Sequence, residues 1–386
     1  MNIFINHYSL ISALGNGVDV TRENLFSGFS PGIISTEKYS PGRGLQLGLV
    51  NADLPDLNNV SLKHRSRNNQ LLLATFNQLR GKFDSHFGDV NKGRIAVIIG
   101  SSTSGIANEE AAFPYMLANG KFPDSFDLSQ RLFCSPANFL AEQLNVTGPA
   151  YGISTACTSS AKAIASAARL LQSGMVDLVI AGGVDTLCKF TVAGFSSIES
   201  ISKDRCNPLS VNRSGINIGE GCALFLMSRE EGDIRLSGWG ESSDGYHISA
   251  PDPKGTGPSI AISGALKMAN KTVKQVEYIN LHGTATHHND LMEASLINGL
   301  GFESLVSSTK PLTGHTLGAA GAIETAICCL TLTDVGRLPP HVWDGHQDPN
   351  LPALNLASSL PSAPKVVMTN NFAFGGNNTS LILESK

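Results

Sequence analysis

The stretch "STACTSSA" (154–161) places one cysteine, Cys157, among small and hydroxyl side chains, just before a segment with helical apolar spacing. The thiolate is the reactive form of cysteine, and a helix N-terminus stabilises it. The helix dipole contributes up to about 2 kcal/mol, which would lower the thiol pKa only to about neutrality. Full activation would need a further group, such as a neighbouring histidine. On this evidence alone, Cys157 is either a nucleophile or a small core residue.

Two later motifs could supply a histidine and a set of backbone donors. "LHGTAT" (281–286) places His282 at the end of a predicted strand, where ligands gather in α/β sheets. "NNFAFGGNN" (370–378) ends another apolar run with a glycine pair. Such a pair permits a tight turn and exposed N–H groups, as an oxyanion hole requires. Taken singly, the histidine could be an ordinary strand-end residue and the glycines an ordinary turn.

The stretch "STKPLTGHTLGAAGAIE" (308–324) adds an ammonium, an imidazole and a carboxylate, from Lys310, His315 and Glu324. Taken singly, Lys310 could be a surface lysine. In combination with Cys157, these groups indicate nucleophilic catalysis much more specifically than any one of them alone. An activated nucleophile needs a base, and the base needs an orienting group.

Short apolar runs alternate with Ala-rich helical stretches along the chain. The pattern predicts strands at 94–100, 176–183, 276–283 and 365–376, and helices at 158–172, 259–270 and 316–332. This alternation predicts an α/β fold with a parallel or mixed sheet covered by helices. "RIAVIIGSST" and "VEYINLHGTAT" echo each other, since both run from an apolar strand through Gly into Ser or Thr. The echo suggests matching elements of two related halves.

Composition narrows the class of protein. The 386 residues suffice for a large core, and only 16% are charged, against about 25% in typical domains. The net charge of −4 argues against a general nucleic-acid binder. Seven cysteines without a Cys-x-x-Cys pair indicate reduced thiols, and no run resembles a signal peptide or a membrane span. We therefore expect a cytoplasmic protein.

With these motifs in this order, the sequence resembles the elongating β-ketoacyl-acyl-carrier-protein synthases of the thiolase-like superfamily. The resemblance covers nearly the whole chain and includes "NPLSVNRSGINIGEGCA" (207–223). It implies a thiolase-like α/β fold whose two related halves form a layered α-β-α-β-α core. Residues 1–250 would form the half with the nucleophile, and residues 251–386 the half with both catalytic histidines.

The resemblance also assigns chemical roles. Cys157 would take an acyl chain from a carrier protein as a thioester. His282 and His315 would assist decarboxylation of a malonyl-carrier thioester, whose enolate then attacks the acyl-Cys carbonyl. Lys310 would orient and electrostatically tune the two histidines, and Glu324 would pair with Lys310.

Other positions would bind or gate the substrate. The backbone N–H groups of Cys157 and Phe374 would hold the oxyanion, and the Phe374 ring resembles the family's gate over the acyl pocket. Thr284 and Thr286 resemble residues that hydrogen-bond the pantetheine arm, and Phe195 resembles an aromatic at the entrance. Ala373 stands where the family usually has Gly, which suggests a specialised enzyme whose gate loop moves differently.

Partners follow from the same resemblance. Carrier proteins are acidic, and Lys63, Arg65 and Arg67 in "SLKHRSR" form a basic cluster that could dock one, although a solvated helix start is the ordinary explanation.

No free cofactor is expected, because the 4′-phosphopantetheine of the carrier protein holds the substrates. The family forms dimers, here either homodimers or heterodimers with a ketosynthase-like chain-length factor. No metal site is expected, because the adjacent His287 and His288 point in different directions.

Three alternatives stay open at this point. A non-catalytic chain-length-factor-like subunit would share the fold but lack the nucleophile. A housekeeping fatty-acid elongation enzyme would share the chemistry, whereas the sequence departures favour a specialised fatty-acid, polyketide or aryl-polyene pathway. A thiolase would need a second catalytic cysteine in the C-terminal loop, which reads Phe-Gly-Gly-Asn here.

Overall fold

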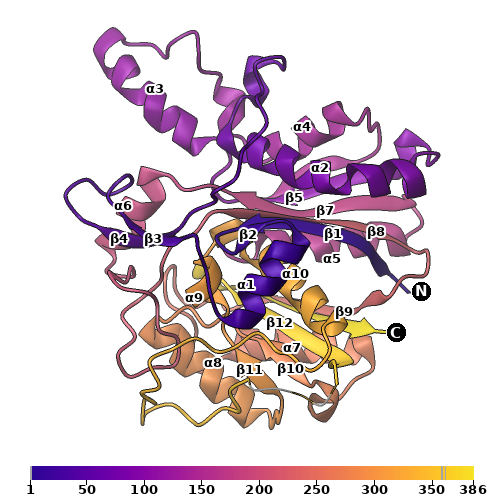
Figure 1. Cartoon of the computed structure of the whole chain (residues 1–386), viewed down its shortest axis with the longest axis vertical. Coiled ribbons are helices and arrows are strands. Elements are labelled where there is room, and N and C mark those ends of the chain that lie inside the picture. Colours follow the sequence, from indigo (N-terminus) through magenta and orange to yellow (C-terminus); the bar gives the residue numbers. More distant parts are fainter. Residues whose placement is uncertain (1, 358–359, 361) are drawn as a thin grey trace.

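One mixed sheet runs through the protein in this computed structural model, which describes residues 2–357, 360 and 362–386 (Figure 1). In spatial order its strands are β11-β10-β12-β13-β9-β1-β8-β7-β5-β6, and β2 pairs with β1. Their bounds are β1 (Phe4–Ser12), β2 (Gly15–Asn16), β5 (Ile95–Gly100), β6 (Ala150–Ile153), β7 (Leu178–Asp185), β8 (Gly221–Ser228), β9 (Ile234–Ser243), β10 (Tyr278–Asn280), β11 (Leu305–Ser307), β12 (Val366–Phe372) and β13 (Asn377–Ser385). A separate antiparallel pair consists of β3 (Ile33–Thr36) and β4 (Leu45–Gly48).

The strand order repeats one pattern twice, and the two copies meet at β1 and β9. In the first copy β5 is parallel to β6 and β7, and β8 is antiparallel to β7 and β1. In the second copy β10 is parallel to β11 and β12, and β13 is antiparallel to β12 and β9. Because β5 and β10 carry the two echoing sequences, the prediction of two related halves is confirmed. The division of the chain after residue 250 stays a prediction.

Helices cover both outer faces of this sheet and also fill the space between its halves. Their bounds are α1 (Val18–Ser27), α2 (Arg67–Phe87), α3 (Ile106–Asn119), α4 (Ser135–Gln143), α5 (Ser159–Gln172), α6 (Lys189–Ser197), α7 (Thr256–Ala269), α8 (His287–Gly299), α9 (Lys310–Thr313) and α10 (Ala320–Thr333). Helices α2 and α4 pack on the first half, α7 and α8 on the second, and α5 and α10 lie between (Figure 1). The predicted α-β-α-β-α layering is confirmed.

The two central helices approach each other closely because small residues line their contact. A Cβ atom on Gly321 of α10 would come within 2.7 Å of the Ala161 Cβ of α5. Nearly all of α10 is buried, which explains why its sequence is apolar around the whole helix. Cys157 lies two residues before the first residue of α5, and Glu324 lies within α10, so this central layer positions part of the candidate chemistry.

Three predicted elements are shorter in the structure than in the sequence analysis. The strand predicted at 276–283 ends at Asn280, the strand predicted at 365–376 ends at Phe372, and the helix predicted from residue 316 begins at Ala320. In each case the excluded residues belong to the chemical motifs. Their backbone groups leave the regular ladders and bond to side chains and loops instead.

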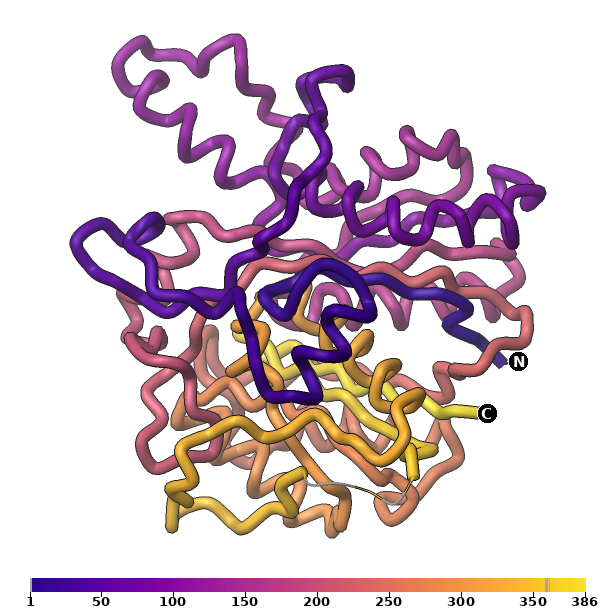
Figure 2. Tube along the Cα trace, viewed as in Figure 1, coloured from indigo at the N-terminus to yellow at the C-terminus, as the bar shows by residue number. Residues whose placement is uncertain are grey.

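A lobe built around α3 projects from one corner of the molecule, at the upper left of Figures 1 and 2. At the opposite side both chain ends lie against β9, because Phe4 pairs with Arg235 and Ser385 pairs with Ile234 (Figure 2). Within the described part of the chain, we find no helix with the length and apolar character needed to cross a bilayer.

Candidate active site

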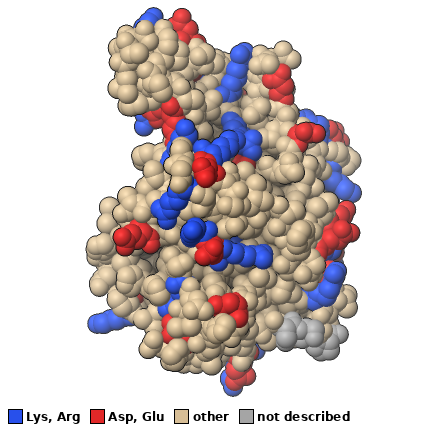
Figure 3. Space-filling model, turned by 60° about the vertical axis from the view of Figure 1, so that its left-hand side comes forward, with Lys and Arg blue, Asp and Glu red and all other residues tan. Residues whose placement is uncertain are grey.

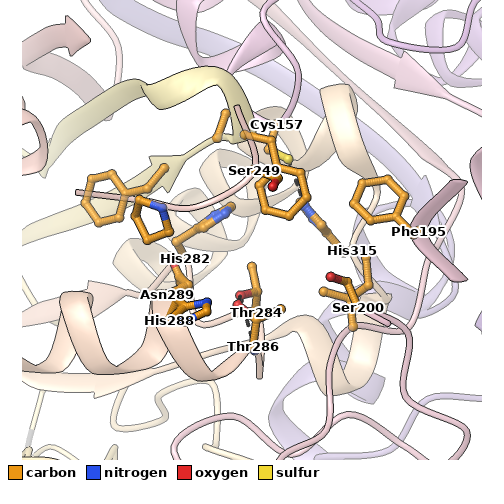
Figure 4. A pocket seen from close by; sticks show the side chains of 15 residues that line it. Cys157, Phe195, Ser200, Ser249, His282, Thr284, Thr286, His288, Asn289 and His315 are labelled. Carbon is orange, nitrogen blue, oxygen red and sulfur yellow. Dashed lines mark hydrogen bonds between the residues drawn. The ribbon is translucent and has the colours of Figure 1, made fainter. Parts of the chain in front are cut away.

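One cavity is lined by Cys157, His282 and His315 together, although they are far apart in the sequence (Figure 4). All three side chains are at most 5% exposed. Their potential ligand or proton-transfer atoms lie within 4.8 Å of one another. The structure therefore brings together the thiol and the two imidazoles that the sequence singled out.

Cys157 lies where the chain turns into α5. The preceding Ala156 has a left-handed backbone with φ of 54°, which a non-glycine residue adopts at some cost and which marks a tight turn. Burial raises the pKa of the Cys157 thiol to about 12, although Lys310 and a hydrogen bond from the backbone N–H of Phe374 oppose the increase. Desolvation therefore opposes the lowering of the thiol pKa that the helix start was expected to produce.

His315 is the group closest to the thiol, with its Nε2 atom 3.0 Å from Cys157 Sγ. Its backbone is fixed on both sides, since its N–H donates to the Asn217 carbonyl and its carbonyl accepts from Gly219 N–H. Burial lowers the pKa of His315 well below 6.5, with Lys310 adding to the effect. The resting pair is consequently a neutral thiol and a neutral imidazole, and the thiol proton can move to His315 during attack.

His282 lies in the loop after β10, with its ring 5.5 Å from that of His315 and nearly perpendicular to it. The backbone N–H groups of His282 and Gly283 each donate to the carboxyl group of Glu293 at 2.8 Å, which fixes the loop against α8. Burial also lowers the pKa of His282 well below 6.5. Glu293 was not predicted from the sequence. Its position eleven residues after His282, on the helix that follows, is a signal that could have indicated it.

Glu293 should make the stability of the protein depend on pH. Burial raises its pKa to about 7 from the usual 4.5, so the folded chain binds this proton more tightly than the unfolded chain. Its contribution to stability is therefore present below about pH 4.5 and is lost as the pH rises through about 7. Urea unfolding between pH 5 and 8 should show this decline for the wild type and a smaller one for Glu293→Gln. Parallel curves for the two proteins would contradict the assignment.

A buried ion pair lies behind the two imidazoles. Lys310 Nζ is 2.5 Å from Glu324 Oε1, and Asn371 Nδ2 donates to Glu324 Oε2 at 2.5 Å. Lys310 and Glu324 are 1% and 2% exposed. Burial raises the pKa of Glu324, and the neighbouring ammonium counteracts this shift. Because Lys310 lowers the pKa of both histidines, the pair sits close enough to influence their charge.

Two segments of the chain match the two domains of one family. Residues 67–232 match "Beta-ketoacyl synthase, N-terminal domain", and residues 234–342 match "Beta-ketoacyl synthase, C-terminal domain". The chain belongs to the beta-ketoacyl synthase family. It is therefore an acyltransferase that forms carbon–carbon bonds, as the sequence predicted.

Individual relatives agree with this family. "3-oxoacyl-[acyl-carrier-protein] synthase 2" of Staphylococcus aureus (strain N315) is 29% identical over 409 residues, covering 99% of this chain and 98% of the relative. Among solved structures, "Ketosynthase (ApeO) in Complex with its Chain Length Factor (ApeC) from Xenorhabdus doucetiae" is 43% identical with a TM-score of 0.95, covering 100% of this chain and 98% of that one. A beta-ketoacyl synthase from Burkholderia phymatum STM815 shares the fold, with 24% identity and a TM-score of 0.89. The match covers 100% of this chain and 99% of the other.

The glycine pair of this beta-ketoacyl synthase forms a tight turn beside the cysteine. Gly375 and Gly376 have left-handed φ values of 80° and 75°, so glycine is favoured at both positions. Ala373 has an extended backbone with φ of −95°, which any residue adopts, so it causes no strain in this arrangement. The Phe374 ring lies 5.7 Å from the Phe195 ring, and both line the cavity.

Thr284 and Thr286 line the same cavity, and their hydroxyl oxygens lie 2.9 Å apart. In Figure 4 they lie across the cavity from Cys157, next to His288 and Ser200. Hydroxyl groups on the wall of this cavity can hydrogen-bond the amides of an extended arm whose end reaches Cys157. This role stays a prediction.

The predicted docking residues make contacts that the sequence did not indicate. Arg67 forms two hydrogen bonds with the carboxylate of Glu220, which is 1% exposed. Lys63 Nζ lies 2.7 Å from Glu142, and Arg65 donates to backbone carbonyls of residues 58 and 60. Each side chain thus has a local role, whereas docking of a carrier protein stays a prediction.

Asp185 is a residue of the site that sequence analysis missed. It lies at the end of β7 and is 1% exposed. Its carboxylate accepts hydrogen bonds from the hydroxyl or N–H groups of Ser101, Ser102 and Thr103, after β5, and from the N–H of Gly318 at 2.6 Å. Gly318 follows His315 by three residues, so Asp185 ties the histidine loop of one half to the other half. Its place at the C-terminal end of a buried strand was the available signal.

Replacing Asp185 by Asn should misplace His315. An amide keeps one acceptor oxygen but turns an NH₂ group toward N–H and hydroxyl donors, so several buried donors lose their partner. We expect a fall of about 10-fold to 100-fold in kcat with little change in KM, and a loss of roughly 1–3 kcal/mol in the free energy of unfolding.

Steady-state kinetics and urea unfolding check this expectation. The matched control is Asp19→Asn, because the Asp19 side chain is 92% exposed and lies outside the cavity. A loss of stability with unchanged kcat would show that Asp185 does not position the histidine loop.

Proposed function

We propose that this protein condenses an acyl chain held on Cys157 with a malonyl group delivered by an acyl carrier protein. The observation that supports the proposal most strongly is the thiol of Cys157 at 3.0 Å from His315 Nε2, in a buried cavity shared with His282. A non-catalytic subunit of the same fold would not need this arrangement. The assignments of catalytic and binding residues below belong to the proposal.

The first step transfers the acyl chain to the enzyme. The Cys157 sulfur attacks the carbonyl of the acyl-carrier thioester while its proton moves to Nε2 of His315. The carbon–sulfur bond to the carrier breaks, and the departing thiolate recovers the proton from His315. The backbone N–H groups of Cys157 and Phe374 hold the negative oxygen of the tetrahedral intermediate.

The second step makes the new carbon–carbon bond. The malonyl-carrier thioester loses CO₂, and the remaining electron pair forms an enolate whose oxygen accepts hydrogen bonds from His282 and from His315, which first takes up a proton from water on Nε2. The enolate carbon attacks the acyl carbonyl, and the bond to the Cys157 sulfur breaks. The Cys157 thiolate takes this proton from His315, and the product is a β-ketoacyl-carrier thioester two carbons longer. Lys310 and Glu324 position the imidazoles, and no free cofactor takes part.

We propose a chain-length-factor-like partner, which would cover the α3 lobe. This lobe and its surroundings expose large apolar side chains, among them Phe113, Tyr115, Leu117, Leu128, Leu132, Phe133 and Phe190. Figure 3 shows few charges on the lobe compared with the band below it. Several large exposed apolar side chains on one lobe are consistent with a protein interface. The solved structure with a chain 43% identical to this one is a ketosynthase, ApeO, in complex with its chain length factor, ApeC.

The same similarity supports a pathway that uses a chain length factor over housekeeping elongation, and we propose an aryl-polyene chain as its substrate. The relatives named 3-oxoacyl-[acyl-carrier-protein] synthase 2 are less similar, at about 29–30% identity. Acyl carrier proteins loaded with saturated, polyene or aryl-substituted chains would distinguish the specialised pathway from housekeeping elongation. Mass spectrometry of the peptide that contains Cys157 should show acylation, fastest with aryl-polyene chains. If no chain is transferred, the proposed activity is wrong, and a preference for saturated chains would indicate housekeeping elongation.

Docking of the carrier protein can be tested at two of the predicted residues. The double variant Lys63→Glu/Arg65→Glu should raise KM for an acyl carrier protein several-fold and leave acylation by a small thioester unchanged. Arg67 is not suitable, because breaking its pair would leave the buried Glu220 unpaired at a cost of about 3–5 kcal/mol. An equal loss with both substrates would contradict the docking role.

A further inference from the structure

The catalytic cavity offers a set of ligands that suits a soft or borderline metal ion. Within the described residues, one group of His, Cys, Asp or Glu side chains converges closely enough to hold a metal ion, and it consists of Cys157, His282 and His315. A thiolate with two imidazoles is a donor set for Zn²⁺ rather than for Mg²⁺ or Ca²⁺, which prefer oxygen ligands. We propose that Zn²⁺ binds to these three side chains, blocks the nucleophile and thereby inhibits the synthase reversibly.

The geometry requires only small movements. Tetrahedral zinc with bonds of about 2.3 Å to sulfur and 2.0–2.1 Å to nitrogen holds its ligand atoms roughly 3.3–3.6 Å apart. Cys157 Sγ and His315 Nε2 are already 3.0 Å apart, and all three ligand atoms lie within 4.8 Å. The two imidazole rings are nearly perpendicular and converge on the sulfur from different elements (Figure 4).

The charges of the ligands are compatible with this binding. Both imidazoles are neutral at ordinary pH, so a ring nitrogen lone pair is available on each. Binding of Zn²⁺ replaces the proton of the Cys157 thiol by a metal–sulfur bond and releases that proton to water. The ammonium of Lys310 opposes a nearby dication, but its ion pair with Glu324 offsets this repulsion.

The surroundings indicate an inhibitory site rather than a resident metal centre. Resident zinc sites usually hold the second ring nitrogen of each histidine with a carboxylate or carbonyl group. Here Nδ1 of His282 and Nδ1 of His315 have no hydrogen-bond partner among the described residues. We therefore infer reversible binding that a chelator removes.

Binding can be measured without any acyl substrate, so its failure is distinct from failure of the proposed condensation. Co²⁺ replaces Zn²⁺ in such sites and reports a coordinated thiolate by its charge-transfer absorption. Titration of the protein with Co²⁺ should give this band at one ion per chain, and Zn²⁺ should displace it. Cys157→Ser should abolish the band, and His282→Ala or His315→Ala should weaken binding more than about 100-fold. The matched controls Cys134→Ser and His86→Ala alter a partly exposed cysteine and an exposed histidine outside the cavity and should leave the band unchanged.

A second measurement uses the unaltered protein. Zn²⁺ should slow alkylation of Cys157 by iodoacetamide at least tenfold, as read from the mass of its peptide, and EDTA should restore the rate. The proposal is overturned if the wild type gives no charge-transfer band, if a control variant removes it, or if Zn²⁺ leaves the alkylation of Cys157 unchanged.

Discussion

Cys157→Gln should lose acyl transfer to the enzyme entirely, a fall of at least about 10⁴-fold in the rate of condensation. The substitution removes the sulfur that forms the thioester, and no other cysteine lines the cavity among the described residues. The two imidazoles stay in place, because their backbone anchors are Asn217, Gly219 and Glu293 rather than Cys157. The variant should therefore still decarboxylate malonyl-carrier thioester, which separates the nucleophile from the decarboxylation machinery.

The measurement is the mass of the peptide around residue 157 after incubation with acyl-carrier thioester, together with conversion of malonyl-carrier to acetyl-carrier protein. The matched control is Cys188→Ala, which removes another buried thiol, at the start of α6 and outside the cavity. Acyl transfer that persists in Cys157→Gln would place the nucleophile elsewhere. Loss of acyl transfer in Cys188→Ala with an intact fold would show that the effect is not specific to the cavity.

The sequence predicted the parts of this site that depend on local pattern. The apolar run before His282 predicts a strand, and His282, just beyond the end of that strand, lines the cavity with Cys157. The small residues around Cys157 were correctly associated with a helix start, because this pattern is local and periodic. The echo between the two strand sequences predicted the two halves, since equivalent strands face equivalent packing.

The contacts between distant segments could not be predicted. Asp185 binds Gly318 across 133 positions of sequence, and Arg67 binds Glu220 across 153 positions. Nothing near either residue indicates its partner. The environment of the Cys157 thiol has a similar origin, since the sequence gives its place at a helix start but not its burial, which raises the thiol pKa. Desolvation depends on how both halves of the fold close over the cavity, and it decides the pKa.

His282→Ala and His315→Ala should separate the two steps of the reaction. The structure places His315 Nε2 at 3.0 Å from the Cys157 sulfur and gives no hydrogen bond between His282 and that sulfur among the described residues. His315→Ala should therefore slow both acylation of Cys157, by about 10²-fold to 10⁴-fold through loss of the base, and decarboxylation. His282→Ala should slow decarboxylation by about 10²-fold to 10³-fold through loss of one donor to the enolate, with acylation within about threefold of the wild type.

Single-turnover acylation, read from the mass of the Cys157 peptide, and release of CO₂ from malonyl-carrier protein measure the two steps independently. His86→Ala, which alters an exposed histidine outside the cavity, serves as the control and should change neither rate. If the two active-site variants reduce acylation equally, the contact between His315 and Cys157 does not act in proton transfer. If His282→Ala leaves decarboxylation intact, His282 does not hold the enolate oxygen. Other groups, such as the Lys310–Glu324 pair next to the rings, would then stabilise the enolate.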